Sequence, residues 1–194
     1  MEQNAALNLF RRSGAYLEGH FRLSSGLHST GYMQSALVLQ DPADASALGA
    51  GLASLVKDLQ PQVVLSPALG GIVIGHEVAR ALGVRALFAE RSAPPASTLS
   101  LRRGFALKPG ERVLVVEDVF TTGGSTKETM EVARAAGAQV VGAAAIVDRS
   151  GGTIDFGVPY KALITISLPT YDAADCPLCK QGTPIVKPGS RPTP

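Results

Sequence analysis

An acidic pair followed by a turn rich in hydroxyls and glycine is the feature of this sequence best suited to chemistry. The stretch reads Val113-Leu-Val-Val-Glu-Asp-Val-Phe-Thr-Thr-Gly-Gly-Ser125. Residues 113–116 predict a strand buried on both faces, as in a parallel sheet. Glu117 and Asp118 are expected where that strand ends. A helix is predicted over 126–136, with Gly137 as its stop.

Each part of this stretch has a chemical use. A glycine-rich turn that opens a helix offers backbone N–H groups and the positive end of the helix dipole, so it attracts phosphate. Thr121, Thr122 and Ser125 add hydroxyl donors. Glu117 and Asp118 would repel a phosphate, so they suit sugar hydroxyls or a metal ion. The combination predicts a ligand with a phosphate beside a vicinal diol, such as ribose 5-phosphate.

The common nucleotide signatures do not fit this stretch. No lysine follows the second glycine, as the Walker pattern requires, and the G-x-G-x-x-G pattern of dinucleotide-binding folds is absent. An ordinary strand–turn–helix connection, with both carboxylates solvated at the sheet edge, remains the alternative.

The string closely resembles the phosphoribosyl-diphosphate motif of type I phosphoribosyltransferases. The resemblance implies that the two carboxylates hold the ribose hydroxyls while residues 121–125 cradle the 5-phosphate. It assigns to this cosubstrate Glu117, Asp118, Val119, Phe120, Thr121, Thr122, Gly123, Gly124 and Ser125. It also implies an α/β fold with a central, mostly parallel sheet flanked by helices, a small N-terminal hood and a β-hairpin with a flexible loop.

The rest of the chain alternates predicted strands and helices, which favours a parallel sheet. Helices are predicted at 4–13, 41–59 and 72–82, and strands at 63–65, 84–89, 140–147 and 162–168. The loop 66–71 again joins a strand to a helix through glycines, so it is a second candidate anion site. The resemblance implies that Ala68, Leu69 and Gly70 grip the pyrophosphate, often through an unusual backbone conformation. A plain strand–helix turn is the alternative.

Two arginines end predicted strands, where open α/β sheets bind ligands. Arg91 suits bidentate recognition of phosphate, with a surface ion pair to Glu90 as the alternative. Arg149 is placed to meet a carboxylate on the acceptor base, and the resemblance assigns the matching arginine to orotate. A salt bridge between Arg149 and Asp148 is the alternative.

The N-terminal region predicts a hairpin with strands at 20–24 and 31–34. The pattern F-x-L-x-S-G-x-x-S at 21–29, followed by Tyr32, resembles the hood of orotate phosphoribosyltransferases. That likeness implies an orotate site formed by Thr121, Arg149 and Tyr32. A small hairpin with Tyr32 in its own core is the alternative, and His28 is expected to be a surface hydrogen-bonding residue.

The chain departs from the family in its lysines. Well-studied orotate enzymes carry them in the hood, the pyrophosphate loop and a mobile loop, where one is considered catalytic. The matching places here are Ser24, Gly70 and an uncharged stretch within 92–100. Residues 92–100 are predicted to be a mobile loop, followed by a strand at 99–105. Arg102 or Arg103 is our first choice as a catalytic substitute; a slow enzyme or a chain that only binds are the other options.

The predicted reaction transfers the 5-phosphoribosyl group from phosphoribosyl diphosphate to orotate, giving orotidine 5′-phosphate and pyrophosphate for pyrimidine biosynthesis. Mg²⁺ is expected mainly on diphosphate and ribose oxygens, with no protein residue dedicated to a metal. A purine or xanthine phosphoribosyltransferase is one alternative, although Tyr171 has no base-reading loop around it. A non-catalytic ligand sensor is the other.

Composition sets the broad class. The 194 residues are 45% hydrophobic and 18% charged, which predicts one globular domain over 1–194. It divides into a hood at about 1–40, a core at 41–168 and a C-terminal segment at 169–194 with a flexible tail from 187. A net charge of +2 gives no electrostatic case for nucleic-acid or membrane partners. A cytoplasmic location is expected from the cysteine content, and a homodimer from the resemblance.

Cys176-Pro-Leu-Cys179 has the spacing of half a zinc site. No second cysteine pair exists, and His20, His28 and His76 show no complementary spacing. A compact surface turn with free thiols is therefore favoured. A cysteine pair shared between subunits is the alternative.

Overall fold

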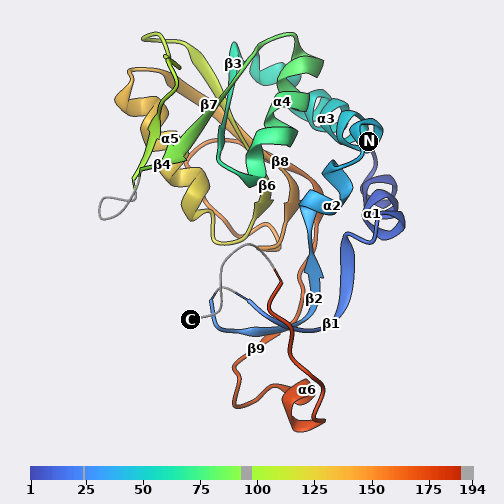
Figure 1. Cartoon of the computed structure of the whole chain (residues 1–194). Helices are drawn as coiled ribbons and strands as arrows, with labels where there is room; N and C mark the ends of the chain where they lie inside the picture. Colours follow the sequence, from blue (N-terminus) through green and yellow to red (C-terminus); the bar gives the residue numbers. More distant parts are fainter. Residues whose placement is uncertain (24, 93–97, 189–194) are drawn as a thin grey trace.

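Two β-sheets organise the molecule (Figure 1). The structure is a computed structural model, and it describes residues 1–23, 25–92 and 98–188. A six-stranded sheet has the order β5-β4-β3-β6-β7-β8, and a three-stranded hood sheet has the order β1-β2-β9. Figure 1 shows the hood sheet and the short helix α6 projecting from one side of the six-stranded core.

The elements alternate as the sequence pattern predicts, with a few additions. In chain order they are α1 Gln3–Arg12, β1 Tyr16–Arg22, β2 His28–Met33, α2 Ser35–Leu39, α3 Pro42–Val56, the 3₁₀ turn η1 Lys57–Leu59, β3 Val63–Pro67, α4 Gly70–Leu82, β4 Arg85–Arg91, β5 Leu99–Leu101, β6 Arg112–Phe120, α5 Gly124–Ala135, β7 Gln139–Asp148, β8 Tyr160–Thr165, β9 Thr170–Tyr171 and α6 Pro177–Lys180.

The core sheet is parallel except at one edge, which confirms the predicted fold class. Strands β4, β3, β6, β7 and β8 run parallel, and β5 pairs antiparallel to β4. Alternate residues of β6 face opposite layers of helices: Leu114 and Val116 pack in the cluster that contains α3 and α4, whereas Val113 and Val115 pack with α5. All four are fully buried, as expected for a strand covered on both faces.

Helix boundaries follow the capping signals in the sequence. The Asp41 carboxylate accepts a hydrogen bond from the Ala43 N–H at 2.8 Å, and Pro42 occupies the first position of α3. Helix α5 ends at Ala135, and Gly137, two residues later, has a left-handed φ of 76°. The helix start predicted at Asp41 and the stop predicted at Gly137 are therefore confirmed.

The predicted end of β6 was wrong. The strand continues to Phe120, so Glu117 and Asp118 lie inside it. Pairing with β3 stops at Leu65–Val115, whereas pairing with β7 continues to Phe120–Asp148. The last residues of β6 are therefore held from one side only. This arrangement leaves the other side open to the loop that follows β3.

The hood strands also differ from the prediction. They cover Tyr16–Arg22 and His28–Met33 instead of 20–24 and 31–34. The pairing begins at Tyr16–Met33 and contains an irregularity between Glu18 and Phe21, which a simple alternation pattern cannot reveal. Strand β9 adds to β2 and brings the C-terminal segment onto the hood.

Strand β5 is shorter than the predicted 99–105, whereas β4 continues past its predicted end at residue 89 to Arg91. Strand β5 ends at Leu101 because the chain then turns, with the Phe105 N–H donating to the Arg102 carbonyl. Strand β8 likewise covers 160–165 in place of 162–168. Residues 93–97 of the predicted mobile loop and 189–194 of the predicted flexible tail lie outside the described residues.

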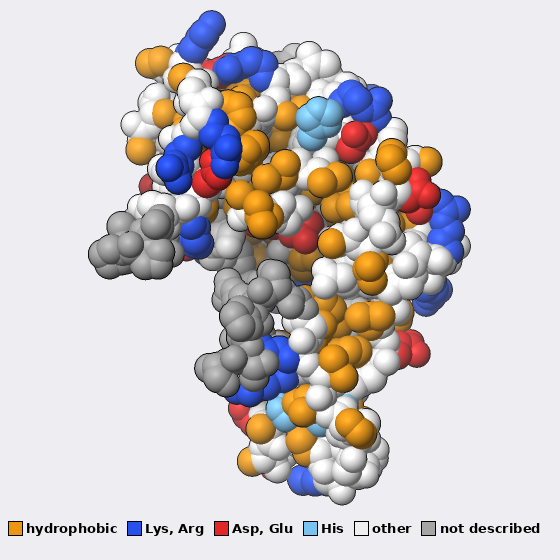
Figure 2. Space-filling view, in the orientation of Figure 1, with side chains coloured by type: hydrophobic (Ala, Val, Ile, Leu, Met, Phe, Trp, Pro, Cys, Tyr) orange, Lys and Arg blue, Asp and Glu red, His pale blue; other side chains and the backbone are white. Residues whose placement is uncertain are grey.

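Charge is mixed over the visible surface. On the face shown in Figure 2, basic and acidic side chains alternate with apolar ones over the described residues. No described helix combines the length and the apolar character needed to cross a membrane.

Candidate active site

The acidic pair lies where β6 has lost its pairing with β3. Glu117 is buried, with 8% of its surface exposed, and Asp118 is partly buried. Burial, and then the neighbouring Asp118 carboxylate, raises the pKa of Glu117 to about 9. Burial also raises the pKa of Asp118. Hydrogen-bond donors or a cation placed beside these two carboxyl groups would therefore stabilise their charged forms.

The loop between β3 and α4 lies against this pair. A Cβ atom added to Gly70 would lie 2.8 Å from the Asp118 Oδ1 atom, so the loop approaches this carboxylate closely and a side chain here would require Asp118 to shift. The Ala68–Leu69 peptide bond is cis, which agrees with the unusual backbone implied for this loop. The exposed Leu69 side chain, at 82%, leaves the backbone as the part of the loop that faces the acidic pair. The second predicted anion site thus adjoins the first.

The turn at 121–125 packs closely at Gly123 and is exposed at its other residues. Gly123 precedes α5 with a left-handed φ of 78°, and a Cβ there would lie 2.8 Å from the Phe156 ring. Phe156 in turn contacts Phe120, with ring centroids 4.9 Å apart. Thr121, Thr122, Gly124 and Ser125 are all exposed. The turn therefore presents its hydroxyls and the N-terminus of α5 outward, as phosphate binding needs.

Arg149 and Tyr32 approach the acidic pair from two other elements. The Arg149 N–H donates to the Phe120 carbonyl at 2.9 Å, so the arginine directly adjoins the motif. Its Nε atom is buried and has no hydrogen-bond partner within the described ranges. Burial raises the pKa of Tyr32, while the Arg149 charge lowers it and the Asp118 charge raises it. The hood tyrosine thus lies within electrostatic reach of both groups.

Within the described residues, Asp148 does not form the salt bridge with Arg149 that was the alternative on the sequence. The Asp148 carboxylate accepts hydrogen bonds from the Ser150 N–H at 2.8 Å and the Ser150 hydroxyl at 2.6 Å, and from the Gly152 N–H at 3.2 Å. These bonds hold Asp148 within the turn that follows β7. The Arg149 guanidinium group can therefore donate to another acceptor.

Arg91 and Arg103 form ion pairs that differ from those considered on the sequence. Arg91 binds Glu128 of α5 at 2.8 Å instead of Glu90. Glu90 instead accepts two hydrogen bonds from Arg103, at 2.6 and 2.8 Å. Arg103 also lies over the Phe88 ring, 5.9 Å from its centroid. Arg103 is therefore engaged in holding the β4–β5 hairpin, while the Arg102 side chain is exposed.

The sequence matches the phosphoribosyl transferase domain family over residues 38–171. It is 53% identical to the orotate phosphoribosyltransferase of Pelotomaculum thermopropionicum over 191 residues, which is 98% of this chain and 99% of that protein. The orotate phosphoribosyltransferase of Heliobacterium modesticaldum is 51% identical over 193 residues, covering 98% of this chain and all of that one. The chain belongs to the orotate phosphoribosyltransferase family.

A solved structure agrees with this assignment. The crystal structure of orotate phosphoribosyltransferase from Aeropyrum pernix superimposes with a TM-score of 0.70 at 28% identity, covering 82% of this chain and 92% of that one. Membership of the orotate phosphoribosyltransferase family confirms the resemblance read from the motif and the hood. It also confirms the predicted fold and the class of enzyme, a transferase.

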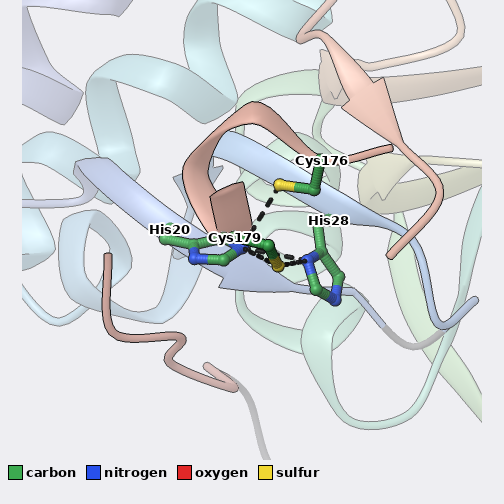
Figure 3. Close-up of side chains that lie close together, drawn as sticks. All are labelled: His20, His28, Cys176 and Cys179. Atoms are coloured by element: carbon green, nitrogen blue, oxygen red, sulfur yellow. Dashed lines mark hydrogen bonds between the residues drawn. The ribbon is translucent and has the colours of Figure 1, made fainter. Parts of the chain in front are cut away.

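Sequence reasoning missed one cluster of side chains that carry metal-binding atoms. His28, expected at the surface, is buried, and so is His20. Both histidines lie beside the Cys176–Cys179 pair (Figure 3). The pairing of β9 with β2 explains this, because it brings the segment after Tyr171 onto the hood. The spacing of the two cysteines was a usable signal, but its partners lie about 150 residues earlier in the chain.

Proposed function

We propose that this chain transfers the 5-phosphoribosyl group from phosphoribosyl diphosphate to orotate, releasing pyrophosphate and forming orotidine 5′-phosphate. One observation carries the proposal: Tyr32, Asp118 and Arg149 come from three separate elements and share one electrostatic environment. A carboxylate-seeking arginine and an aromatic ring beside a sugar-binding acid fit a flat, anionic base next to a ribose.

The cosubstrate would lie along the open edge of β6. Its 5-phosphate would bind the turn 121–125, and its ribose hydroxyls would donate to Glu117 and Asp118. Its pyrophosphate would reach the backbone of 68–70, which Gly70 brings against Asp118. Hydroxyl donors lower the free energy of the charged carboxylates, so binding would reverse part of the pKa rise that burial causes at this pair.

The acceptor would lie between the hood and the end of β7. The orotate carboxylate would accept hydrogen bonds from Arg149, whose buried Nε atom has no partner within the described residues. Tyr32 and Thr121 would border the ring. The orotate ring nitrogen then forms a bond to the anomeric carbon as the bond from that carbon to pyrophosphate breaks, and the proton of that nitrogen passes to the departing pyrophosphate. Positive charge develops on the sugar in the transition state, and the nearby carboxylates stabilise it.

The donor set also suits Mg²⁺ carried by the cosubstrate. Gly70 lies beside the two adjacent carboxylates, at a position where family members carry lysine. Without that lysine, the charge of the pyrophosphate would be balanced by a cation. Glu117 and Asp118 would contact such an ion through the ribose oxygens that they bind. Mg²⁺ would supply neutralisation of the charge on the departing pyrophosphate.

We further assign the role of the missing loop lysine to Arg102. Both side chains are exposed, but the ion pair with Glu90 engages Arg103, whereas Arg102 forms no ion pair within the described residues. A loop of this kind can serve the site of a partner subunit, and we propose a homodimer that works in the cytoplasm. Residues 93–97, at the tip of the hairpin, lie outside the described residues.

Consumption of phosphoribosyl diphosphate with four separate acceptors tests the proposal. The acceptors are orotate, uracil, xanthine and hypoxanthine, each with Mg²⁺. Turnover with orotate alone supports the assignment. Turnover with xanthine or hypoxanthine would instead establish a purine enzyme. Binding of the activated sugar without turnover of any base would establish a ligand sensor.

A further inference from the structure

Four side chains with metal-binding atoms meet in the hood, far from the acidic pair in the chain. His20 belongs to β1, His28 begins β2, Cys176 precedes α6 and Cys179 lies within α6. Figure 3 shows all four pointing toward one another. One atom from each, a ring nitrogen or a sulfur, lies within 4.8 Å of the other three.

The spacing of these atoms fits a single small ion. The His20 Nε2 and His28 Nδ1 atoms are 2.9 Å apart, and the Cys179 sulfur is 3.2 Å from His28 Nδ1. The sulfurs of Cys176 and Cys179 lie 3.5 and 3.7 Å from His20 Nε2. A tetrahedral zinc ion with two nitrogen and two sulfur ligands separates its ligand atoms by about 3.3–3.8 Å. To coordinate one, the widest separation within the cluster, up to 4.8 Å, would have to shorten by about 1 Å, and the four distances given above would have to change by a few tenths of an ångström or less.

The protonation of His20 is set by its surroundings. Its Nδ1 atom lies 2.8 Å from the Thr183 carbonyl oxygen, which can only accept, so Nδ1 carries the proton. The Nε2 atom consequently presents a lone pair to the other three side chains. An imidazole whose second nitrogen donates to a backbone carbonyl is the usual arrangement of a zinc-binding histidine.

The backbone around His20 is fixed as well. The His20 carbonyl accepts a hydrogen bond from the Val186 N–H at 2.8 Å, and the Arg22 N–H donates to the Val186 carbonyl at 2.9 Å. Three of the four side chains are buried: His20 at 3%, His28 at 6% and Cys176 at 0%. The two cysteines are not joined in a disulfide. The site is thus preformed and partly shielded from water.

We propose that His20, His28, Cys176 and Cys179 bind one Zn²⁺ ion. All four coordination positions would be filled by protein, which is the pattern of a structural site and leaves no position for a substrate. The ion would tie the β1–β2 hairpin to the C-terminal segment, two parts separated by most of the chain. Figure 1 places α6 at the end of the hood remote from the core sheet. The site stabilises the hood that carries Tyr32 and does not depend on the identity of the substrate.

Metal content of the purified full-length chain gives the first test. Protein produced with added Zn²⁺ and passed over a desalting column is expected to hold about one zinc per chain. The double variant Cys176→Ser, Cys179→Ser and the variant His28→Ala are expected to lose it. His76→Ala is the matched control, because His76 is an exposed histidine outside the cluster and its removal should leave the zinc in place. Unchanged zinc in the double cysteine variant would overturn the proposal.

Replacement of the ion by Co²⁺ gives a second test, which can be made on the wild-type chain even where a cluster variant fails to fold. A tetrahedral site with two thiolates predicts intense visible absorption and sulfur-to-cobalt charge-transfer bands in the wild type and in His76→Ala. Removal of the metal by a chelator should lower the melting temperature, and added Zn²⁺ should restore it. A weak octahedral spectrum, or a wild-type chain that takes up neither ion, would contradict the assignment.

Discussion

At the scale of single residues, the candidate active site contains ionisable groups whose burial is unfavourable, and a bound ligand would offset that cost. Glu117 is buried beside another carboxyl group, and burial together with that neighbour raises its pKa to about 9. Arg149 is half-buried, and burial lowers its pKa. Each group alone destabilises the fold slightly, because charge is costly to remove from water. In the proposed function, the acidic group would face a sugar diol and the arginine an anionic base.

Replacement of Glu117 by glutamine should stabilise the free protein in a pH-dependent way. The pKa of Glu117 is about 9 in the folded chain and 4.5 ordinarily. The folded state therefore keeps a proton that the unfolded chain has lost between these values, so stability is full below pH 4.5 and falls as the pH rises toward 9. Glu117→Gln removes this loss.

Thermal melting from pH 4 to pH 9 checks the effect. The variant should melt on the order of a few degrees above the wild type at pH 8. The difference should vanish near pH 4.5, where both side chains are neutral. A difference that does not change with pH would show that Glu117 titrates normally in the folded chain.

Replacement of Arg149 by alanine should act on the base and spare the sugar. Loss of a buried charged donor to the orotate carboxylate predicts a rise in KM for orotate on the order of a hundredfold. The Kd for phosphoribosyl diphosphate, measured by calorimetry, should change little. Arg134→Ala is the matched control, since Arg134 is an exposed arginine paired with Glu131 within α5. Equal losses of affinity for orotate and for phosphoribosyl diphosphate would show that Arg149 does not act on the base alone.

At the scale of elements, two glycine turns do the positioning. Gly70 allows the β3–α4 loop to reach Asp118, and Gly123 adopts a left-handed φ over the Phe156 ring. Each glycine places a helix N-terminus beside the end of β6. A side chain at Gly123 would meet the Phe156 ring in a strained backbone conformation, whereas one at Gly70 would require the Asp118 carboxylate to move.

A pair of glycine substitutions separates backbone strain from loss of the site. Gly83, at the C-terminus of α4, has a φ of 70° with nothing near a new Cβ, whereas Gly123 has a φ of 78° and Phe156 at 2.8 Å. Gly83→Ala should cost about 1 kcal/mol of stability and leave activity intact. Gly123→Ala should cost more and should also weaken binding of phosphoribosyl diphosphate. Denaturant unfolding and calorimetry measure both effects, and matching behaviour of the two variants would argue against a positioning role for Gly123.

Much at this scale could be predicted from the sequence, because the signals are local. The buried strand at 113–116, the cap at Asp41 and the stop at Gly137 each depend on a few neighbouring residues. The true end of β6 could not be found this way, because it depends on continued pairing with β7 after β3 has turned away. The ion pair of Arg103 with Glu90 depends likewise on how β5 folds back on β4.

At the scale of the whole molecule, the chain combines a six-stranded core sheet with a three-stranded hood sheet, and we propose that the activated sugar binds between them. Strand β9 and the segment after it link the C-terminal end of the chain to the hood. The cluster at His20 and Cys176 joins residues 156 positions apart. The spacing of the two cysteines indicated half of this cluster. The two histidines could not be recognised in the same way, because they become neighbours only through antiparallel strand pairing.

Mixing two inactive variants tests whether the hairpin loop serves a partner subunit. Arg102→Ala should lower kcat with little effect on affinity for the activated sugar, and Asp118→Asn should weaken that affinity. If the loop acts across a two-fold interface, each mixed dimer contains one intact site, so re-paired equal mixtures should recover about a quarter of wild-type activity. Size-exclusion chromatography verifies the dimer. No recovery in a verified mixed dimer would place the loop over its own site.

The central claim is that the open end of β6 recognises an activated ribose through its hydroxyls and its phosphate together. The most direct test is a crystal structure of the chain with phosphoribosyl diphosphate and Mg²⁺. We predict density for the 5-phosphate at residues 121–125 and for the ribose hydroxyls against Glu117 and Asp118. Clear density for the sugar elsewhere, with the turn at 121–125 filled only by water, would contradict it.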